Sequence, residues 1–248
     1  MCIRDSSRED LSAFVNEHYS PDRMILSAAG GIDHDTLCRL AEKAFGDLPK
    51  PKISHRSRAA AFSGGEFRRD KKLEQAHFAL AFESPSYRSR DIYTAQVYSI
   101  ALGGGMSSRL FQQIREKRGL CYSIFAQAGA FSDTGFTTIY AGTSAEQIPD
   151  LANLTVNELK RAALDLSEAE VTRARSQMKA GLLMGLESPS SRAERLARMI
   201  QIWGKVPSLD ETINKIDSVN LEKVRAYAEH VTTQAKFAMA LYQSLIHI

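Results

Sequence analysis

The chain has 248 residues, of which 44% are hydrophobic and 25% charged, and these are ordinary values for a globular protein with one large or two modest domains. No run of about 18 apolar residues occurs, so no membrane span is expected. The net charge of +3 is too small to indicate a nucleic-acid partner, which normally requires a concentrated basic stripe. The three cysteines are scattered without a Cys-x-x-Cys pair, which argues against a disulfide framework and favours a reducing compartment.

The first 49 residues predict a helix, a strand and a second helix. Ser6 and Glu9 have the spacing of a capping box, and apolar residues follow at helical spacing. The apolar run at residues 24–26 predicts a short strand that ends at a glycine pair. Asp33 is then placed to cap an amphipathic helix.

Residues 50–72 lose this periodicity. Basic residues are scattered there among prolines, serines and a pair of glycines. This composition predicts an exposed linker, and its positive charge is typical of a solvated surface. We therefore place a domain boundary in this segment.

The remaining residues predict a second α+β unit. Apolar residues alternate from residue 76 to 82, as in a half-buried strand. Helices are expected at 91–102 and 107–118, and strands at 122–131 and 136–143 are joined as a hairpin. Further helices and a last strand at 236–242 complete the unit, with capping residues at Ser167, Ser188, Ser208 and Asn220.

A helix followed by a short apolar strand occurs at both ends of the chain. Residues 10–24 and 223–237 correspond in residue type and spacing. Two related units would explain this repeat, although helix-then-strand pairs are common in unrelated proteins.

The six histidines do not form a local metal site. No two lie at the i, i+4 spacing of a helical zinc site, and no His-x-x-Glu-His or inverted motif occurs. His77 is expected to be structural, on the strand face opposite Phe78. Cys121 is expected to be a packing residue, because the nearby helix C-terminus raises the pKa of a thiol.

Three consecutive glycines, Gly103, Gly104 and Gly105, stand between the two predicted helices. Such a loop can cradle a phosphate, but here it lacks the Lys-Ser/Thr pair of a P-loop and does not follow a strand. A tight bend or a flexible loop beside a ligand is favoured.

The helix after the glycines carries an arginine near its end. The apolar stripe of this helix leaves Arg109, Arg115 and Arg118 at or near its polar side. Gly119 is a predicted left-handed cap that turns the chain into the strand at Tyr122. An arginine and a phenol that converge from two elements suit recognition of a carbonyl or carboxylate. A surface arginine beside a core tyrosine is the alternative.

These segments together resemble the pitrilysin/insulinase family of zinc metallopeptidases, and in particular its mitochondrial processing peptidase-like branch. The resemblance is carried by the following strings: Leu-Gly-Gly-Gly-Met-Ser-Ser-Arg-Leu-Phe-Gln at 102–112, Arg-Glu-Lys-Arg-Gly-Leu-Cys-Tyr-Ser at 115–123, Ser-Asp-Thr-Gly at 132–135, Tyr-Ala-Gly-Thr at 140–143, Leu-Leu-Met-Gly-Leu-Glu-Ser at 182–188 and His-Tyr-Ser-Pro-Asp-Arg-Met at 18–24. It covers nearly everything between residues 6 and 242.

The resemblance implies a repeated α+β domain with a mixed, largely antiparallel sheet and helices packed on one face. Residues 1–49 would be the tail of a first, zinc-bearing domain, 50–72 a linker and 73–243 a second domain. Residues 1–5 and 244–248 fit no neighbouring element and are expected to be extensions foreign to the natural protein. The zinc ligands and catalytic base would lie upstream of Met1, so no metal ligand is expected in this chain and its autonomous activity is in doubt.

The resemblance also assigns the site. Arg115 and Tyr122 would contact a substrate carbonyl and stabilise charge on the tetrahedral intermediate, and the peptide would bind extended along a sheet edge. Gly103, Gly104 and Gly105 would contact the substrate. The expected partners are the zinc-bearing portion, an extended peptide and a homodimer or heterodimer mate. A bacterial cytoplasm is favoured over a mitochondrial matrix, and the alternative function is a non-catalytic scaffold of the same fold.

Overall fold

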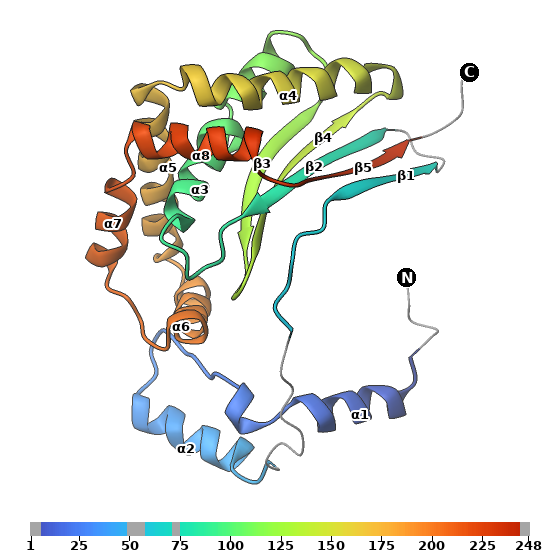
Figure 1. Ribbon diagram of the computed structural model, residues 1–248. Coiled ribbons are helices and arrows are strands. Elements are labelled where there is room, and N and C mark those ends of the chain that lie inside the picture. The colour runs from blue at the N-terminus through green and yellow to red at the C-terminus, as the bar shows by residue number, and fades with distance from the viewer. Residues whose placement is uncertain (1–5, 49–57, 71–74, 244–248) are drawn as a thin grey trace. The chain divides into compact units, whose positions relative to one another are not determined.

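The computed structural model describes residues 6–48, 58–70 and 75–243 and divides the chain into two compact units (Figure 1). The first unit contains Met1–Arg58 and Leu183–Val206, and the second contains Ala59–Leu182 and Pro207–Ile248. None of the helices in the described ranges combines the length and the apolarity needed to cross a bilayer.

A five-stranded sheet organises the second unit. Its strand order is β1-β5-β2-β4-β3, in which only β1 and β5 pair in parallel. The strands are β1 (Gly65–Asp70), β2 (Ala76–Ser84), β3 (Ser123–Ala130), β4 (Gly135–Thr143) and β5 (Phe237–Gln243). The mixed, largely antiparallel sheet confirms the predicted fold class.

One face of this sheet forms the core. The alternation along β2 places Phe78, Leu80 and Phe82 in the core, whereas His77 and Ala79 point to the opposite, half-buried face. The core residues of the sheet pack with those of the surrounding helices, chiefly α3 (Ile92–Gly103), α4 (Ile148–Asp165), α5 (Glu168–Gly185) and α8 (Leu221–Thr233) (Figure 1). We call the half-buried side the open face.

Several predicted helix starts are confirmed by side-chain caps. Ser188 caps α6 (Pro189–Trp203), Ser208 caps α7 (Leu209–Asp217) and Asn220 caps α8. Each of these side chains accepts a hydrogen bond from the amide three residues later. Helix starts follow from local chemistry, which explains why the sequence pattern located them.

The first unit departs from the expected helix, strand and helix. Its helices are α1 (Arg8–His18), α2 (His34–Phe45) and α6, with a short 3₁₀ turn at Pro21–Arg23. The capping box of α1 uses Ser7 and Asp10, one residue later than predicted from Ser6 and Glu9. Residues 24–29 form no strand, because no neighbouring strand in the described ranges supplies the hydrogen bonds that a strand requires. The predicted strand at 24–26 is therefore wrong for this chain.

Two further expectations need correction in the second unit. The predicted linker contains β1, whose pairing with β5 could not be recognised from its Arg- and Glu-containing sequence. The helix predicted at 107–118 is interrupted, because the residues Phe111–Glu116 form a π-helix rather than a regular α-helix. The predicted terminal extensions lie outside the described residues.

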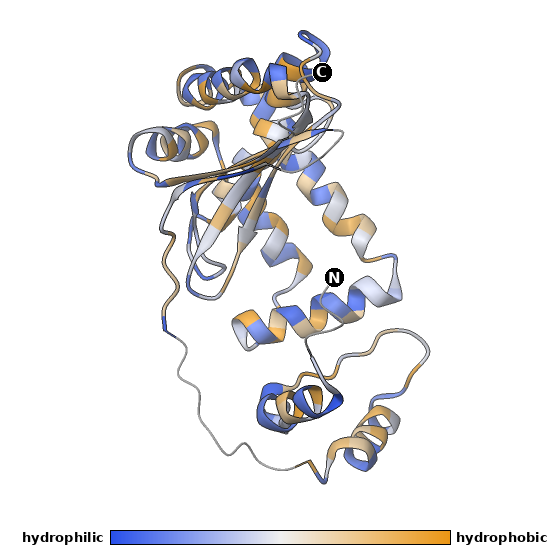
Figure 2. Cartoon of the chain, turned by 90° about the vertical axis from the view of Figure 1, so that its right-hand side faces the viewer, coloured by the Kyte–Doolittle hydropathy of each residue, from blue (hydrophilic) through white to orange (hydrophobic). Residues whose placement is uncertain are grey.

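Figure 2 shows how hydropathy is distributed over the elements. The helices carry both hydrophobic and hydrophilic stretches, as helices with one packed side do. In α1 and α2 the pattern is amphipathic, yet neither helix has a buried residue.

Candidate functional site

The three glycines form the end of α3. An added Cβ at Gly103 would come within 2.7 Å of the Ala126 Cβ, so this glycine allows α3 to pack directly on β3. The Gln177 side chain donates a hydrogen bond of 2.6 Å to the Gly104 carbonyl. The amides of Gly104 and Ser108 bond to the carbonyls of Ile100 and Gly105, so both serve the turn itself. The geometry is that of the tight bend favoured by the sequence.

Arg109 anchors the segment that follows this bend. Its guanidinium makes a two-pronged contact with Glu170, at 2.6 Å from Nε to Oε1 and 2.9 Å from Nη2 to Oε2. It also bonds the Asp165 carboxylate and, at 2.9 Å, the Asp165 carbonyl. The Arg109 side chain is only 10% exposed, which corrects its expected place on the polar side of the helix.

This anchor shifts the pKa of both carboxylates. Burial alone would raise the pKa of Glu170, but hydrogen bonds from Arg109 and Ser167 outweigh it and hold the pKa below its ordinary value. Asp165 behaves in the same way, with Arg109 and Arg161 as its donors. Ser167 and Glu170 form the predicted capping box of α5, but their role in holding Arg109 was not predicted. The contact joins residues 61 positions apart, and no local pattern signals it.

The π-helix positions Arg115. Its wider turn is marked by a hydrogen bond from the Lys117 amide to the Gln112 carbonyl, five residues back. The chain then reverses at Gly119, whose φ of 61° is the left-handed conformation that glycine adopts without strain. π-Helical turns are often found at functional sites.

Arg115 and Tyr122 converge at this reversal, which is the first of the two arrangements that the sequence pattern left open. The Arg115 Cζ lies 4.5 Å from the centre of the Phe111 ring and 5.7 Å from that of Tyr122, within cation–π range. The Tyr122 side chain is 79% exposed, so its phenol is not in the core. Its amide donates to the Gly142 carbonyl at 3.2 Å, which ties it to β4. In the described ranges, no carboxylate pairs with Arg115, so its guanidinium remains available to an acceptor from outside.

The other predicted side chains near the site have structural roles. Arg118 donates to the Gln113 carbonyl at 2.7 Å. Cys121 is buried, and burial raises the pKa of its thiol despite the opposing effect of the Arg115 charge. This agrees with its interpretation as a packing residue.

Metal ligands do not gather in the part of the chain that the structure describes. No three His, Cys, Asp or Glu side chains of that part are grouped so that they could hold an ion. These residues therefore do not fit a resident zinc site.

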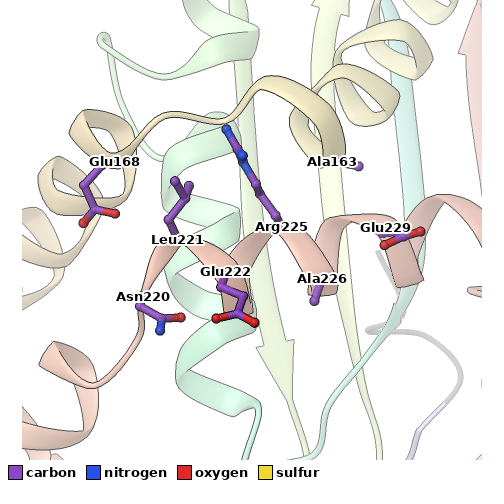
Figure 3. A pocket seen from close by; sticks show the side chains of 8 residues that line it. All are labelled: Ala163, Glu168, Asn220, Leu221, Glu222, Arg225, Ala226 and Glu229. Carbon is purple, nitrogen blue, oxygen red and sulfur yellow. The ribbon is translucent and has the colours of Figure 1, made fainter.

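A separate hollow of about 570 Å³ lies over α8 (Figure 3). Its lining comprises Ala163, Glu168, Asn220, Leu221, Glu222, Arg225, Ala226 and Glu229. Arg225 reaches from α8 to the α4–α5 connection, where its Nε donates to the Leu166 carbonyl at 2.9 Å. The hollow includes neither Arg115 nor Tyr122 and is not part of the candidate site.

The sequence is similar to a known family model and to curated proteins. The model of the peptidase M16 inactive domain matches residues 5–178. An uncharacterized zinc protease of Mycobacterium bovis is 35% identical over 243 residues, which cover 95% of this chain and 55% of the relative. The uncharacterized zinc protease YmxG of Bacillus subtilis is 36% identical over 236 residues, covering 94% and 57%. The chain thus spans little more than half the length of these relatives.

Solved structures share the fold at lower identity. A chain of complex III2 from Candida albicans, with Inz-5 bound, superposes with a TM-score of 0.83 at 22% identity and covers 96% of this chain and 59% of its own length. A protease from Helicobacter pylori superposes with a TM-score of 0.78 at 19% identity, covering 96% and 60%. The match of the inactive-domain model over residues 5–178 and the similarity to the zinc protease relatives confirm the resemblance found in the sequence: the chain belongs to the peptidase M16 family.

Proposed function

We propose that this chain is the substrate-binding, zinc-free portion of a zinc-dependent endopeptidase. The observation that carries the proposal is the convergence of Arg115 and Tyr122, where a guanidinium that no carboxylate of the described residues pairs lies beside an exposed phenol. The names of the relatives as zinc proteases support a proteolytic role.

In this role Arg115 and Tyr122 both donate hydrogen bonds to a carbonyl oxygen of the bound peptide. Negative charge develops on that oxygen when the peptide bond is attacked, and donors that are already in place stabilise it. The rings of Phe111 and Tyr122 limit the motion of the Arg115 guanidinium. We place Gly104 and Gly105 beside the substrate. Gly103 is buried against β3 and allows the end of α3 to pack on that strand.

The zinc ion and the catalytic base would come from a partner portion outside this chain. The described residues offer no ligand group, so no step of the reaction is assigned to them through the metal. In α1, Leu11, Phe14 and Val15 form an exposed apolar stripe, and such stripes normally pack against another polypeptide surface. We infer that this stripe contacts the zinc-bearing portion, and a homodimer or heterodimer mate is a further candidate partner.

A non-catalytic scaffold is the second candidate function. It is favoured by the superposition on a chain of complex III2, which shares the fold at 22% identity. The same fold therefore also occurs in a chain of that complex.

The test uses the full-length protein that contains this chain. Its cleavage of a quenched fluorescent peptide, chosen from a decapeptide library, is measured for the Tyr122→Phe and Arg115→Ala variants. Each variant removes one donor to developing charge, so kcat/KM should fall at least about tenfold while bound zinc stays stoichiometric. Arg118→Ala is the matched control, because this arginine lies on the same segment but donates to a backbone carbonyl.

The outcomes separate the two candidates. Peptide cleavage that all three variants leave unchanged would remove Arg115 and Tyr122 from the site. A full-length protein that cleaves no peptide would favour the scaffold. Chelator-sensitive proteolysis by this chain alone would contradict its assignment as the zinc-free portion.

A further inference from the structure

The open face of the sheet carries a cluster of polar side chains that the proposed function does not use. His77 on β2, Ser123 on β3 and Tyr140 on β4 point to this face, and Gln75 precedes β2. Gly142 lies between them, paired with His77 on one side and with Ser123 on the other. We call these five residues the Gly142 cradle.

The side chains converge over the glycine. A Cβ added to Gly142 would lie 3.3 Å from the Ser123 Oγ, 3.4 Å from the Gln75 Oε1 and 3.6 Å from the Tyr140 hydroxyl. The absence of a side chain at Gly142 therefore leaves a small space that three polar atoms border. Any larger residue would fill this space and separate the polar atoms from an incoming group.

Some hydrogen-bonding groups of the cradle are not used by other described residues. The Tyr140 hydroxyl and the His77 Nδ1 are 2.8 Å apart and share one hydrogen bond. Within the described ranges, the Gln75 amide and the Ser123 hydroxyl have no hydrogen-bond partner. The four side chains are an amide, two hydroxyls and an imidazole, and together they offer both donors and acceptors.

The cradle adjoins the candidate site. Ser123 directly follows Tyr122, and the Tyr122 amide donates to the carbonyl of Gly142. The Phe125 ring, 42% exposed, stacks beside Tyr140 at 5.2 Å on the same face. The cradle is therefore connected to the candidate site through the backbone of Tyr122 and Gly142.

We propose that the Gly142 cradle binds the main chain of the extended peptide substrate, next to the bond that Arg115 and Tyr122 contact. This inference rests on the proposed function. A peptide group presents one donor and one acceptor, which matches an uncharged cluster that offers both. The Phe125 ring then contacts a substrate side chain on the same edge of the peptide.

The test is a steady-state measurement of kcat and KM on the full-length protein, with the quenched fluorescent decapeptide as substrate. Gln75→Ala and Ser123→Ala each remove one hydrogen bond made equally to bound substrate and transition state. KM should rise about 3- to 10-fold while kcat stays within about twofold. Gly142→Ala fills the space and should raise KM in the same way. Gln127→Ala is the matched control, because Gln127 is also an exposed glutamine on the open face of β3 but lies outside the cradle.

Direct binding gives a second readout. The labelled decapeptide is titrated with the full-length protein, treated with a chelator to prevent cleavage, and followed by fluorescence anisotropy, and Gln75→Ala should weaken the affinity by the same factor. Because Gln75 is exposed and outside the strands, its truncation leaves folding intact even if Gly142→Ala does not fold.

Failure of this inference differs from failure of the proposed function. If Arg115→Ala lowers kcat/KM but the cradle variants have the KM and affinity of the parent protein, the cradle does not bind substrate. If Arg115→Ala also has no effect, the proposed function itself is wrong. An equal rise in KM for Gln127→Ala would assign the effect to the whole face and overturn the role of the cradle.

Discussion

Replacing Arg109 with methionine should destabilise the second unit more than any single surface ion pair can. Methionine keeps the length of the side chain but removes the charge and the donors. Glu170, whose side chain is 18% exposed, would then keep its bonds to Ser167 but lose both contacts with the guanidinium. Asp165, at 45% exposed, can be rehydrated at little cost.

The size of this destabilisation follows from the exposed fractions of the Glu170 and Asp165 side chains. Breaking a buried ion pair costs about 3–5 kcal/mol, and an exposed pair contributes about 0–1 kcal/mol. Because Glu170 keeps partial access to water, we expect a loss of about 3 kcal/mol at pH 7. Lys179→Ala, which removes a more exposed ion pair with Asp217, should cost no more than about 1 kcal/mol.

The destabilisation caused by Arg109→Met should depend on pH. The pKa values of Glu170 and Asp165 are lowered in the folded state, so the contact stabilises fully above their ordinary values of 4.5 and 3.8. It is lost as the pH falls through the lower, folded values and the carboxylates become protonated. The difference between parent and Arg109→Met should therefore shrink below about pH 4.5.

Hydrogen exchange of the buried amides in β2 and β4, followed in increasing urea, measures the free energy of unfolding of the second unit separately from the first. A difference below about 1 kcal/mol at pH 7, or one that is the same at pH 7 and pH 4, would refute the role assigned to the Arg109 anchor.

Three further predictions concern the packing of the second unit and the accessibility of its cysteine and tyrosine side chains. Gly103→Ala should destabilise the second unit by about 1–3 kcal/mol in the same exchange assay, because the added methyl group collides with β3. Gly181→Ala, in open space on α5, is the control and should be neutral or stabilising by up to about 1 kcal/mol. Equal effects of the two substitutions would exclude the packing explanation. Cys121, whose pKa burial raises, should react with a thiol reagent at pH 8 far more slowly than the exposed Cys38 in a variant that lacks the third cysteine, and equal rates would contradict its burial. Tyr227→Phe should lower the free energy of unfolding in urea by about 1 kcal/mol, because the hydrogen bond to the buried Ser84 is lost. In the parent protein, burial raises the pKa of Tyr227 to about 12, so the ultraviolet titration of this phenol should begin at a higher pH than that of an exposed tyrosine.

Much of the candidate site was accessible from the sequence because its signals are local. Arg115 and Tyr122 are separated by a single helix end and a glycine cap, so their approach follows from seven residues of chain. Helix caps at Ser188 and Asn220 are equally local, since each side chain bonds an amide three residues away.

Other features depended on distant residues. The Arg109–Glu170 contact joins residues 61 positions apart, and the sequence pattern placed Arg109 on the solvent side instead. The strand β1 went unrecognised because its edge position tolerates charged residues and only its pairing with β5 defines it. The predicted strand at residues 24–26 failed for the reverse reason, since an apolar run without a paired neighbour forms no sheet.

The sequence by itself determined the α+β class, because hydrophobic periodicity and helix caps are properties of neighbouring residues, and its resemblance to known strings indicated the family and singled out Arg115 and Tyr122. Only the tertiary structure decided which side chains meet across strands. His77, expected to be structural, contacts the Tyr140 hydroxyl and pairs with Gly142 only because β2, β4 and β3 pair in one register. Strand register is set by contacts between residues remote in the chain, and it is what brings the Gly142 cradle beside Tyr122.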